Sequence, residues 1–295
     1  MPMQRELAHP GFWRAVLLVL LAFGVQVVMS VPLGIIDVVF QNVLHQPSPK
    51  LEREPVLVGF INLVAFGAAI ALGLYLNRLS LRRAFPITGV TAQQVIAVAI
   101  IVLGMAVLLS EADNVFRVLL KPPEWLANAL KDLFFAENKL LSRIFLLVLI
   151  APITEETLFR GVILRGLLSR YRPATALALS AFLFGAIHAN PWQLLSAFFL
   201  GIVFGWFYLR TGSLLLCVLA HAMANGLTLV CTLIPLNIPG LTGQPDYTAT
   251  VFQPWWLDLC GLCILLAGLW FFCRASPKNE PSPGPPPPPL MPQVS

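Results

Sequence analysis

Two adjacent carboxylates, Glu155 and Glu156, lie inside an apolar stretch, and Arg160 follows four residues after the second of them. Residues four apart share a helical face, so Glu156 can form an ion pair with Arg160. Glu155 points about 100° away on the same helix and stays available for another partner. An acidic residue at the centre of a membrane helix costs about 2.5–3.5 kcal/mol on insertion scales. Because building a fold requires no such carboxylate pair, these three residues are candidates for chemistry.

Two further pairs place polar side chains in apolar segments. Phe184 and His188 are four residues apart, and so are His221 and Asn225, so each pair shares one helical face. Taken singly, each has a structural explanation, since a histidine in a membrane more often bonds a neighbouring helix than performs chemistry. Together, a carboxylate, two imidazoles and an amide could activate a water and stabilise an oxyanion.

The composition shows which solvent surrounds these residues. Of 295 residues, 58% are hydrophobic and 11% are charged, whereas soluble domains carry roughly 25% charged residues. This excludes an ordinary cytosolic enzyme, and the hydrophobicity excludes a disordered chain. The formal net charge of +5 predicts no nucleic-acid partner, because basic residues in membrane proteins more often mark cytoplasmic loops. The lipid bilayer is the expected partner.

Eight segments are apolar enough to cross a bilayer, which takes about 20 residues. The third is short, and the fifth and sixth are separated only by Asn190-Pro191. The first is too long for a signal peptide, so we expect it to stay in the protein. The sequence therefore predicts an all-α polytopic bundle of about eight transmembrane helices. The predicted spans are 13–36, 56–76, 94–110, 143–164, 174–190, 193–209, 213–234 and 255–273.

Basic residues mark every second connection between these spans and both ends of the chain. They are Arg5, Arg14, Arg78, Arg82, Arg83, Arg165, Arg170, Arg172, Arg210, Arg274 and Lys278. Under the positive-inside rule this pattern predicts that both termini are cytoplasmic. We expect an integral protein of a bacterial plasma membrane, since the sequence carries no retention signal.

The segment 115–139 differs from the spans. After Pro122-Pro123, apolar residues recur at helical spacing with charged residues between them. This predicts an amphipathic helix that lies in the membrane interface or caps an extramembrane loop. The chain thus divides into three N-terminal spans, this segment, a core with the last span, and a Pro-rich disordered tail. The boundaries are 1–114, 115–139, 140–273 and 274–295.

The three motifs resemble those of a known family. EETLFRG from Glu155, FGAIH from Phe184 and HAMAN from His221 are similar to the EExxxR, FxxxH and HxxxN motifs of the CPBP family. These are the CAAX proteases and bacteriocin-processing proteins, also called the Abi family of intramembrane endopeptidases. The motifs occur in order on separate predicted helices, and the resemblance covers residues 140–235.

This resemblance implies a helical membrane protease whose site opens toward the cytoplasm or the bilayer. Glu155 would be the general base and, with His188, would position the attacking water. His221 and Asn225 would stabilise the tetrahedral oxyanion. We therefore expect hydrolysis of a peptide bond in a membrane-associated protein or peptide, as CAAX-type C-terminal processing or as peptide or bacteriocin-type maturation.

The remaining motif residues and a metal follow from the same resemblance. Glu156, paired with Arg160, would order the catalytic side chains. Glu155, His188 and His221 could hold zinc, but the HExxH motif is absent and no spacing demands a metal, so a cofactor is not required. The alternative is a non-catalytic membrane immunity or scaffold protein that uses the polar cluster as a structural helix clamp.

Overall fold

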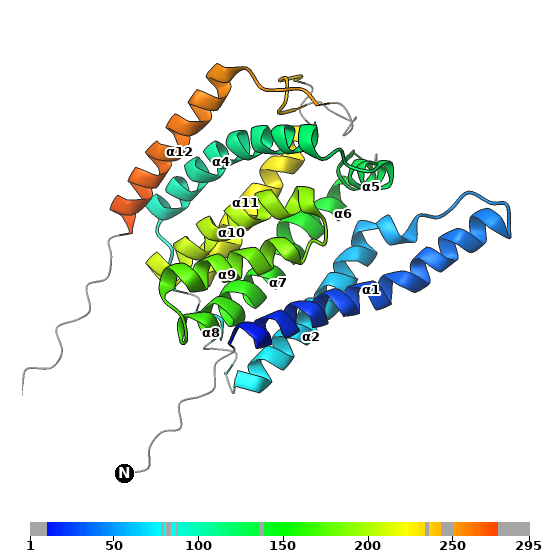
Figure 1. Cartoon of the computed structure of the whole chain (residues 1–295), viewed down its shortest axis with the longest axis horizontal. Helices are drawn as coiled ribbons and strands as arrows, with labels where there is room; N and C mark the ends of the chain where they lie inside the picture. Colours follow the sequence, from blue (N-terminus) through cyan, green and yellow to red (C-terminus); the bar gives the residue numbers. More distant parts are fainter. Residues whose placement is uncertain are drawn as a thin grey trace, which may run out of the picture.

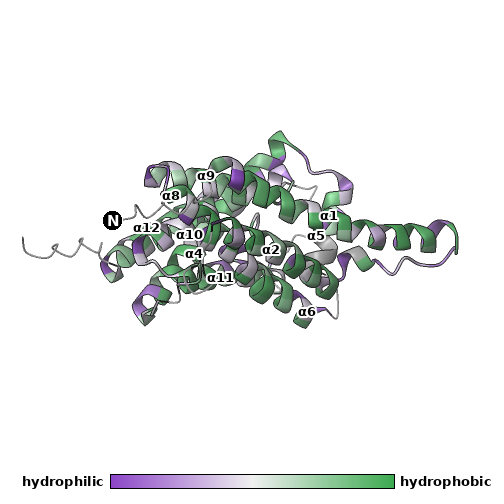
Figure 2. Ribbon diagram, turned by 90° about the horizontal axis from the view of Figure 1, so that it is seen from below, coloured by the Kyte–Doolittle hydropathy of each residue, from purple (hydrophilic) through white to green (hydrophobic). Residues whose placement is uncertain are grey.

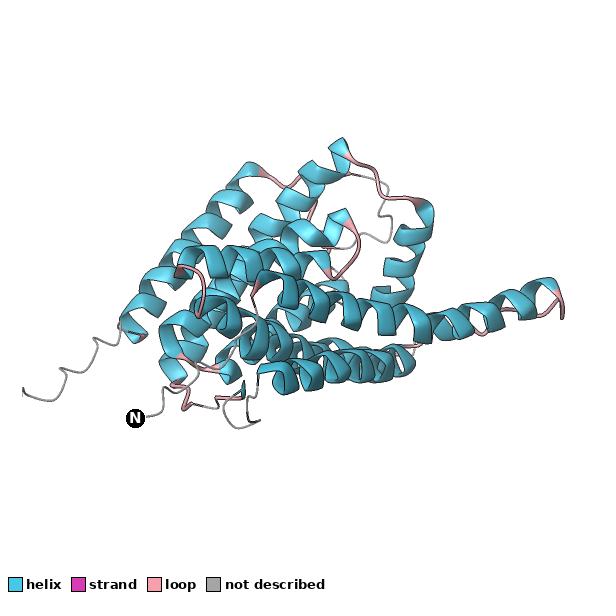
Figure 3. Ribbon diagram, turned by 60° about the horizontal axis from the view of Figure 1, so that its bottom comes forward, coloured by secondary structure: helices cyan, strands magenta, loops and turns pink. Residues whose placement is uncertain are grey.

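The computed structural model is helical throughout the residues that it describes, with no strand among them (Figure 1). These residues are 11–77, 80, 84–86, 88–135, 139–233, 236–242 and 250–276. Figure 3 shows helices joined by short loops over most of this part of the chain. The predicted all-α fold class is thereby confirmed. Most of the Pro-rich tail, residues 277–295, lies outside the described residues, so the disorder predicted for it stays a prediction.

Six of the described helices are long and apolar enough to cross a membrane, which makes the chain an integral membrane protein. They are α1 (Phe12–Asn42), α2 (Pro55–Asn77), α4 (Ala92–Leu119), α10 (Pro191–Thr211), α11 (Leu214–Leu233) and α12 (Trp255–Ala275). Figure 2 shows these helices as hydrophobic along most of their length, with hydrophilic residues gathered near their ends. A shorter apolar helix, α9 (Pro173–Ala186), accompanies them.

The predicted span 143–164 lies in an uninterrupted helical run over residues 140–168. Two π-helical segments divide the run, and π-helical turns often occur at functional sites. Its parts are α6 (Leu140–Ile144), η2 (Phe145–Ile150), α7 (Ala151–Glu156), η3 (Thr157–Leu164) and α8 (Arg165–Leu168). Each of the eight predicted spans therefore corresponds to a described helix or helical run.

Helix α4 is longer than the predicted span 94–110, because it continues to Leu119. Charged residues follow residue 110, but the helix accommodates them. Arg117 forms an ion pair with Asp113, which lies one turn before it in α4. The predicted segment 115–139 is therefore wrong at its start, since its first five residues belong to α4.

The amphipathic helix predicted after the two prolines is present as α5 (Glu124–Phe135). Its Leu126 and Ala127 are buried, whereas the neighbouring Trp125 is 66% exposed. One face of α5 thus packs on the bundle, as an amphipathic helix should.

The predicted span 174–190 is also wrong at its end, because α9 stops at Ala186. Pro191 disfavours a helical conformation at the residue before it, and Asn190 instead caps α10, its Oδ1 accepting a hydrogen bond from Gln193 N at 2.8 Å. Ala189 adopts a left-handed conformation with φ 53°. His188 therefore lies in the turn between α9 and α10 rather than inside a helix.

The 140–168 run lies in the centre of the bundle and contacts α2, α9, α10 and α11. Five apolar side chains of η3 are fully buried in the core, namely Leu158, Phe159, Val162, Ile163 and Leu164. On the outside, α4 packs mainly against α12 and α11, α9 against α10, and α1 against α2. The central run can thus present polar side chains to several neighbouring helices at once.

The contact between α4 and α12 is close because Gly104 has no side chain. A Cβ atom on Gly104 would lie 2.6 Å from the backbone N of Leu265 and 2.8 Å from the carbonyl oxygen of Gly261. We expect Gly104→Ala to lower the free energy of unfolding by about 1–3 kcal/mol, because the two backbones must separate. The measurement is reversible unfolding in detergent micelles. Gly67→Ala is the control, since no atom lies within 4 Å of the added Cβ. Equal stability of both variants would contradict the close contact.

Candidate active site

The carboxylate of Glu156 joins two of the three motifs. Its Oε1 accepts a hydrogen bond from Arg160 Nη1 and another from His221 Nδ1, both at 2.9 Å. The side chains of Glu156 and Arg160 are 0% and 1% exposed, so this ion pair lies in the interior. The ion pair expected between Glu156 and Arg160 is present. His221 of α11 joins it, because it bonds the same carboxylate oxygen.

Arg160 ties the central run to two other helices. Its Nη2 donates a hydrogen bond to the carbonyl oxygen of Gly201 in α10 at 2.9 Å. The guanidinium carbon lies 4.7 Å from the ring centroid of Phe184 in α9 and 5.7 Å from that of Phe204 in α10. These cation–π contacts gain strength where water is excluded. Arg160 therefore fixes the positions of α9 and α10 around the carboxylate.

The His221 ring is held by Glu156 and by two aromatic rings. It meets Phe184 edge-on at 5.6 Å and stacks on Phe204 at 5.6 Å between ring centroids. Since a carboxylate accepts hydrogen bonds, Nδ1 of His221 carries the proton. Nε2 is then the nitrogen that can act on another molecule, as an acceptor in the neutral ring and as a donor in the imidazolium.

His188 has a similar orientation. Its Nδ1 lies 3.0 Å from the carbonyl oxygen of Phe184, which can only accept, so Nδ1 donates and Nε2 remains available. The ring meets that of Phe184 edge-on at 5.8 Å. The aromatic ring expected beside this imidazole is therefore present, although His188 lies two residues beyond the end of α9.

Asn225 satisfies a backbone carbonyl in the central run. Its Nδ2 donates a hydrogen bond to the carbonyl oxygen of Leu147 in η2 at 2.8 Å. In the π-helical pattern, Ala151 N bonds Leu146 O, and the residue that would bond Leu147 O is Pro152, which has no N–H. A buried carbonyl needs a partner. Asn225 supplies it, and its second amide hydrogen is left for other contacts.

Glu155 differs from its neighbour. Its side chain is 8% exposed, and no described residue donates a hydrogen bond to its carboxylate. Since the ion pair involves Glu156, Glu155 is the carboxylate that the protein does not use internally. It does not line the cavity that the other motif residues share.

A cavity of about 400 Å³ lies between α4, α9, α10 and α11. His188, His221 and Asn225 line it, with Phe184 and Phe204 beside them. The structure thus brings Phe184 and His188 of the second motif and His221 and Asn225 of the third to a common wall. Glu156 and Arg160 lie behind that wall.

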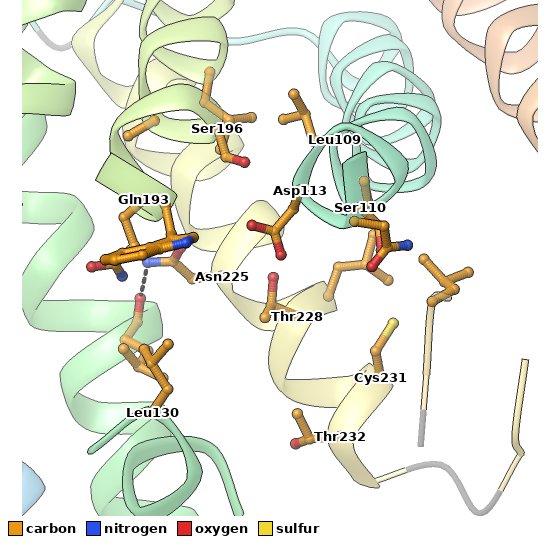
Figure 4. A pocket seen from close by; sticks show the side chains of 18 of the residues that line it. Leu109, Ser110, Asp113, Leu130, Gln193, Ser196, Asn225, Thr228, Cys231 and Thr232 are labelled. Carbon is orange, nitrogen blue, oxygen red and sulfur yellow. Dashed lines mark hydrogen bonds between the residues drawn. The ribbon is translucent and has the colours of Figure 1, made fainter. Parts of the chain in front are cut away.

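The cavity also has polar residues that the sequence motifs did not indicate, and Figure 4 shows Asp113 of α4 and Thr228 of α11 facing each other across it. The sequence did not indicate Asp113 as a cavity residue, because the predicted span 94–110 ended before it. Its ion pair with Arg117, four residues apart as in Glu156 and Arg160, is the signal that could have placed it on a helix. Other polar lining residues outside the motifs are Ser110, Asn114, Arg117, Gln193, Ser196, Thr232 and Thr242.

The residues present do not form a zinc site in this arrangement. Within the part of the chain that the structure describes, no three His, Cys, Asp or Glu side chains gather so as to hold a metal ion. Of the three candidate ligands, His188 and His221 line the cavity and Glu155 does not. The chemistry is therefore derived from the side chains themselves.

Comparison with known proteins supports the resemblance. Residues 137–227 match the family model "Type II CAAX prenyl endopeptidase Rce1-like". Over 89 residues the chain is 30% identical to a protein of Bacillus subtilis (strain 168) named "Putative membrane peptidase YdiL", covering 30% of this chain. The chain spans 36% of the length of that relative. No solved structure matches the chain significantly. The matched segment, residues 137–227, contains all three motifs and is similar to the Rce1-like prenyl endopeptidases.

Proposed function

We propose that this chain is an intramembrane endopeptidase that hydrolyses a peptide bond in a membrane-associated protein or peptide. The observation that carries the proposal is the shared wall of His188, His221 and Asn225, backed by the buried carboxylate of Glu156. Three polar side chains that each leave a donor or acceptor toward one cavity match the requirements of peptide hydrolysis. The match of residues 137–227 to an endopeptidase family model supports the same reaction.

In the proposed reaction, Glu155 is the general base and His188 positions the attacking water through Nε2. Glu155 suits this role because no described hydrogen bond uses its carboxylate. Its side chain does not line the cavity, so we propose that it turns toward the substrate when the site is filled. Catalytic hydrogen bonds often tighten only in the substrate complex.

The negative charge that develops on the carbonyl oxygen would meet His221 and Asn225. Protonated at Nε2, His221 is an imidazolium, and the Glu156 carboxylate at its Nδ1 stabilises that cation. Asn225 offers the amide hydrogen that Leu147 does not take. Both donors are held by buried partners, so the site needs little rearrangement as the charge forms.

A helix clamp without catalysis is the competing interpretation, and the contacts of Arg160 do serve as such a clamp. A clamp alone, however, gives no reason for His188, His221 and Asn225 to line one cavity together. The cavity therefore favours the protease.

The test is cleavage of a fluorescence-quenched farnesylated peptide, and of the same peptide without the lipid, by purified protein in liposomes. We expect wild type to cleave at least one peptide, and His188→Ala to lower kcat by about 10²–10³-fold, because the water loses its orienting acceptor. Ser196→Ala is the control, since Ser196 lines the same cavity outside the motifs. Cleavage of the farnesylated peptide alone would indicate CAAX-type processing. Full activity of His188→Ala would contradict the assignment.

Asn225→Ala is expected to lower kcat by about 10²-fold with little change in KM, since a donor to the oxyanion acts in the transition state. The measurement is steady-state cleavage of the same peptide. Thr228→Val is the matched control, because Thr228 lies one turn further along α11 and its hydroxyl donates to the carbonyl oxygen of Ala224 in the same helix. A rise in KM with unchanged kcat would instead place Asn225 in substrate binding alone.

A further inference from the structure

His188 lies in the turn between α9 and α10, two helices that pack side by side (Figure 1). Their contact is close, because a Cβ atom on Gly185 would lie 2.8 Å from the carbonyl oxygen of Leu194. The first turn of α10 is also fixed to the end of α4, since Trp192 Nε1 donates a hydrogen bond to the carbonyl oxygen of Leu120 at 2.7 Å. The helices on both sides of His188 are therefore held in place.

The turn holds the backbone of His188 at both of its polar groups. The N–H donates a hydrogen bond to the carbonyl oxygen of Gly185 at 3.3 Å, and the carbonyl oxygen accepts one from Asn190 Nδ2 at 3.2 Å. Ala189, between the two bonded residues, has φ 53°. A residue with a Cβ atom keeps this left-handed conformation only where neighbouring contacts impose it. The Asn190 side chain makes such a contact, because it bridges Ala189.

Asn190 also joins the turn to the first turn of α10. Its Oδ1 accepts a hydrogen bond from Gln193 N at 2.8 Å and caps the helix. Its Nδ2 donates to His188 O and to Gln193 Oε1, the second at 2.5 Å. A carboxylate at this position could still cap α10 but could not donate. Capping and holding His188 can thus be separated by substitution.

Asn190 does not line the cavity, whereas His188 and Gln193 do. Its effect on a bound substrate would therefore pass through His188. With the backbone of His188 fixed, Nδ1 bonds the carbonyl oxygen of Phe184 at 3.0 Å. This bond determines which ring nitrogen carries the proton and leaves Nε2 as an acceptor.

We propose that Asn190 is a positioning residue, which holds the His188 imidazole in the orientation and tautomer that orient the attacking water. The proposal rests on the proposed function, because it assigns Asn190 to the same reaction. Without the bond to His188 O, the turn gains other conformations and the bond from Nδ1 to Phe184 O weakens. The ring then adopts in part the tautomer with the proton on Nε2, which free imidazole side chains prefer in water. That tautomer cannot accept a hydrogen bond from the water.

Asn190→Asp tests the proposal, because it keeps the acceptor for Gln193 N and removes the donor to His188 O. We expect kcat for the quenched peptide to fall about 10–100-fold, since a small misplacement of a catalytic group has effects of this size. KM and the unfolding midpoint in detergent should stay unchanged, because aspartate caps helices as well as asparagine does. Asn190→Ala is expected to lose as much kcat and also to lower the midpoint. Since alanine is neutral, the shared loss of kcat would not come from an added charge.

Thr91→Ala is the matched control for the loss of a helix cap. Thr91 caps α4 by accepting a hydrogen bond from Gln94 N at 3.2 Å, three residues along, as Asn190 does from Gln193. Thr91 does not line the cavity. We expect this variant to lower the unfolding midpoint and to keep the wild-type kcat.

The tautomer of His188 can be measured without substrate by ¹⁵N NMR of histidine-labelled protein in detergent at mildly alkaline pH. His188→Ala identifies its resonances. We expect a proton on Nδ1 in wild type and a mixture of tautomers in Asn190→Asp. A wild-type tautomer in Asn190→Asp, or a wild-type kcat, would overturn the inference. If wild type cleaves no peptide, the proposed function fails, while the tautomer still decides whether Asn190 positions His188.

Discussion

Arg160→Met is expected to leave little folded protein, because it strips the buried Glu156 carboxylate of its counter-charge. Breaking a buried ion pair by removing one partner costs about 3–5 kcal/mol, and the side chains of this pair are 1% and 0% exposed. The variant also loses the bond to Gly201 O and the cation–π contact with Phe184. The measurement is the folded fraction after extraction in detergent, together with the unfolding midpoint.

The double variant Glu156→Gln with Arg160→Met shows whether the uncompensated charge is the cause. It removes both charges, and replacing a buried pair by neutral side chains is often close to neutral for stability. We expect it to recover much of the folded protein and none of the activity. If it were as unstable as Arg160→Met alone, the loss would come from packing and not from the charge.

Glu155→Gln is expected to lower kcat by about 10³-fold while the protein stays folded. The substitution keeps the size of the side chain and removes the base, and general base catalysis contributes about 10²–10⁴-fold. Folding should be unaffected, because no described hydrogen bond uses this carboxylate. The measurement is single-turnover cleavage of the quenched peptide at equal amounts of folded protein.

The neighbouring substitution Glu156→Gln is the matched control, since it changes the same chemical group one residue along the chain. It is expected to lower stability as well as activity, because Glu156 binds both Arg160 and His221. A Glu155→Gln protein that unfolds like Glu156→Gln would show that both carboxylates are structural. Full activity of Glu155→Gln would exclude it as the base.

Features that depend on local spacing could be predicted from the sequence. The Glu156–Arg160 pair follows from one helical turn, and the approach of Phe184 to His188 follows from the same spacing. The apolar spans follow from the length that a bilayer requires. Each of these is set by residues within about one helix, so no knowledge of tertiary packing is needed.

Contacts between distant segments could not be predicted. The bond from His221 to Glu156 joins residues 65 positions apart, and nothing in either motif says which faces of the two helices meet. The bond from Asn225 to Leu147 depends on a π-helical register combined with Pro152. The length of α4 was underestimated because its charges form pairs within the helix, which hydropathy does not record.

The cavity likewise required the three-dimensional arrangement. The motifs indicate which side chains converge, but the cavity wall also takes polar side chains from α4, among them Ser110 and Asp113. Asp113 belongs to a helix outside the matched segment 137–227.

The central claim, hydrolysis by water activated at Glu155, is tested most directly by mass spectrometry of products formed in H₂¹⁸O. Purified wild-type protein in liposomes is mixed with a smaller amount of peptide, and Glu155→Gln is treated in parallel. The account predicts that wild type cleaves one peptide bond and that the new carboxyl group carries ¹⁸O, while Glu155→Gln leaves the peptide intact. An intact peptide with wild type, or equal product from both proteins, would contradict it.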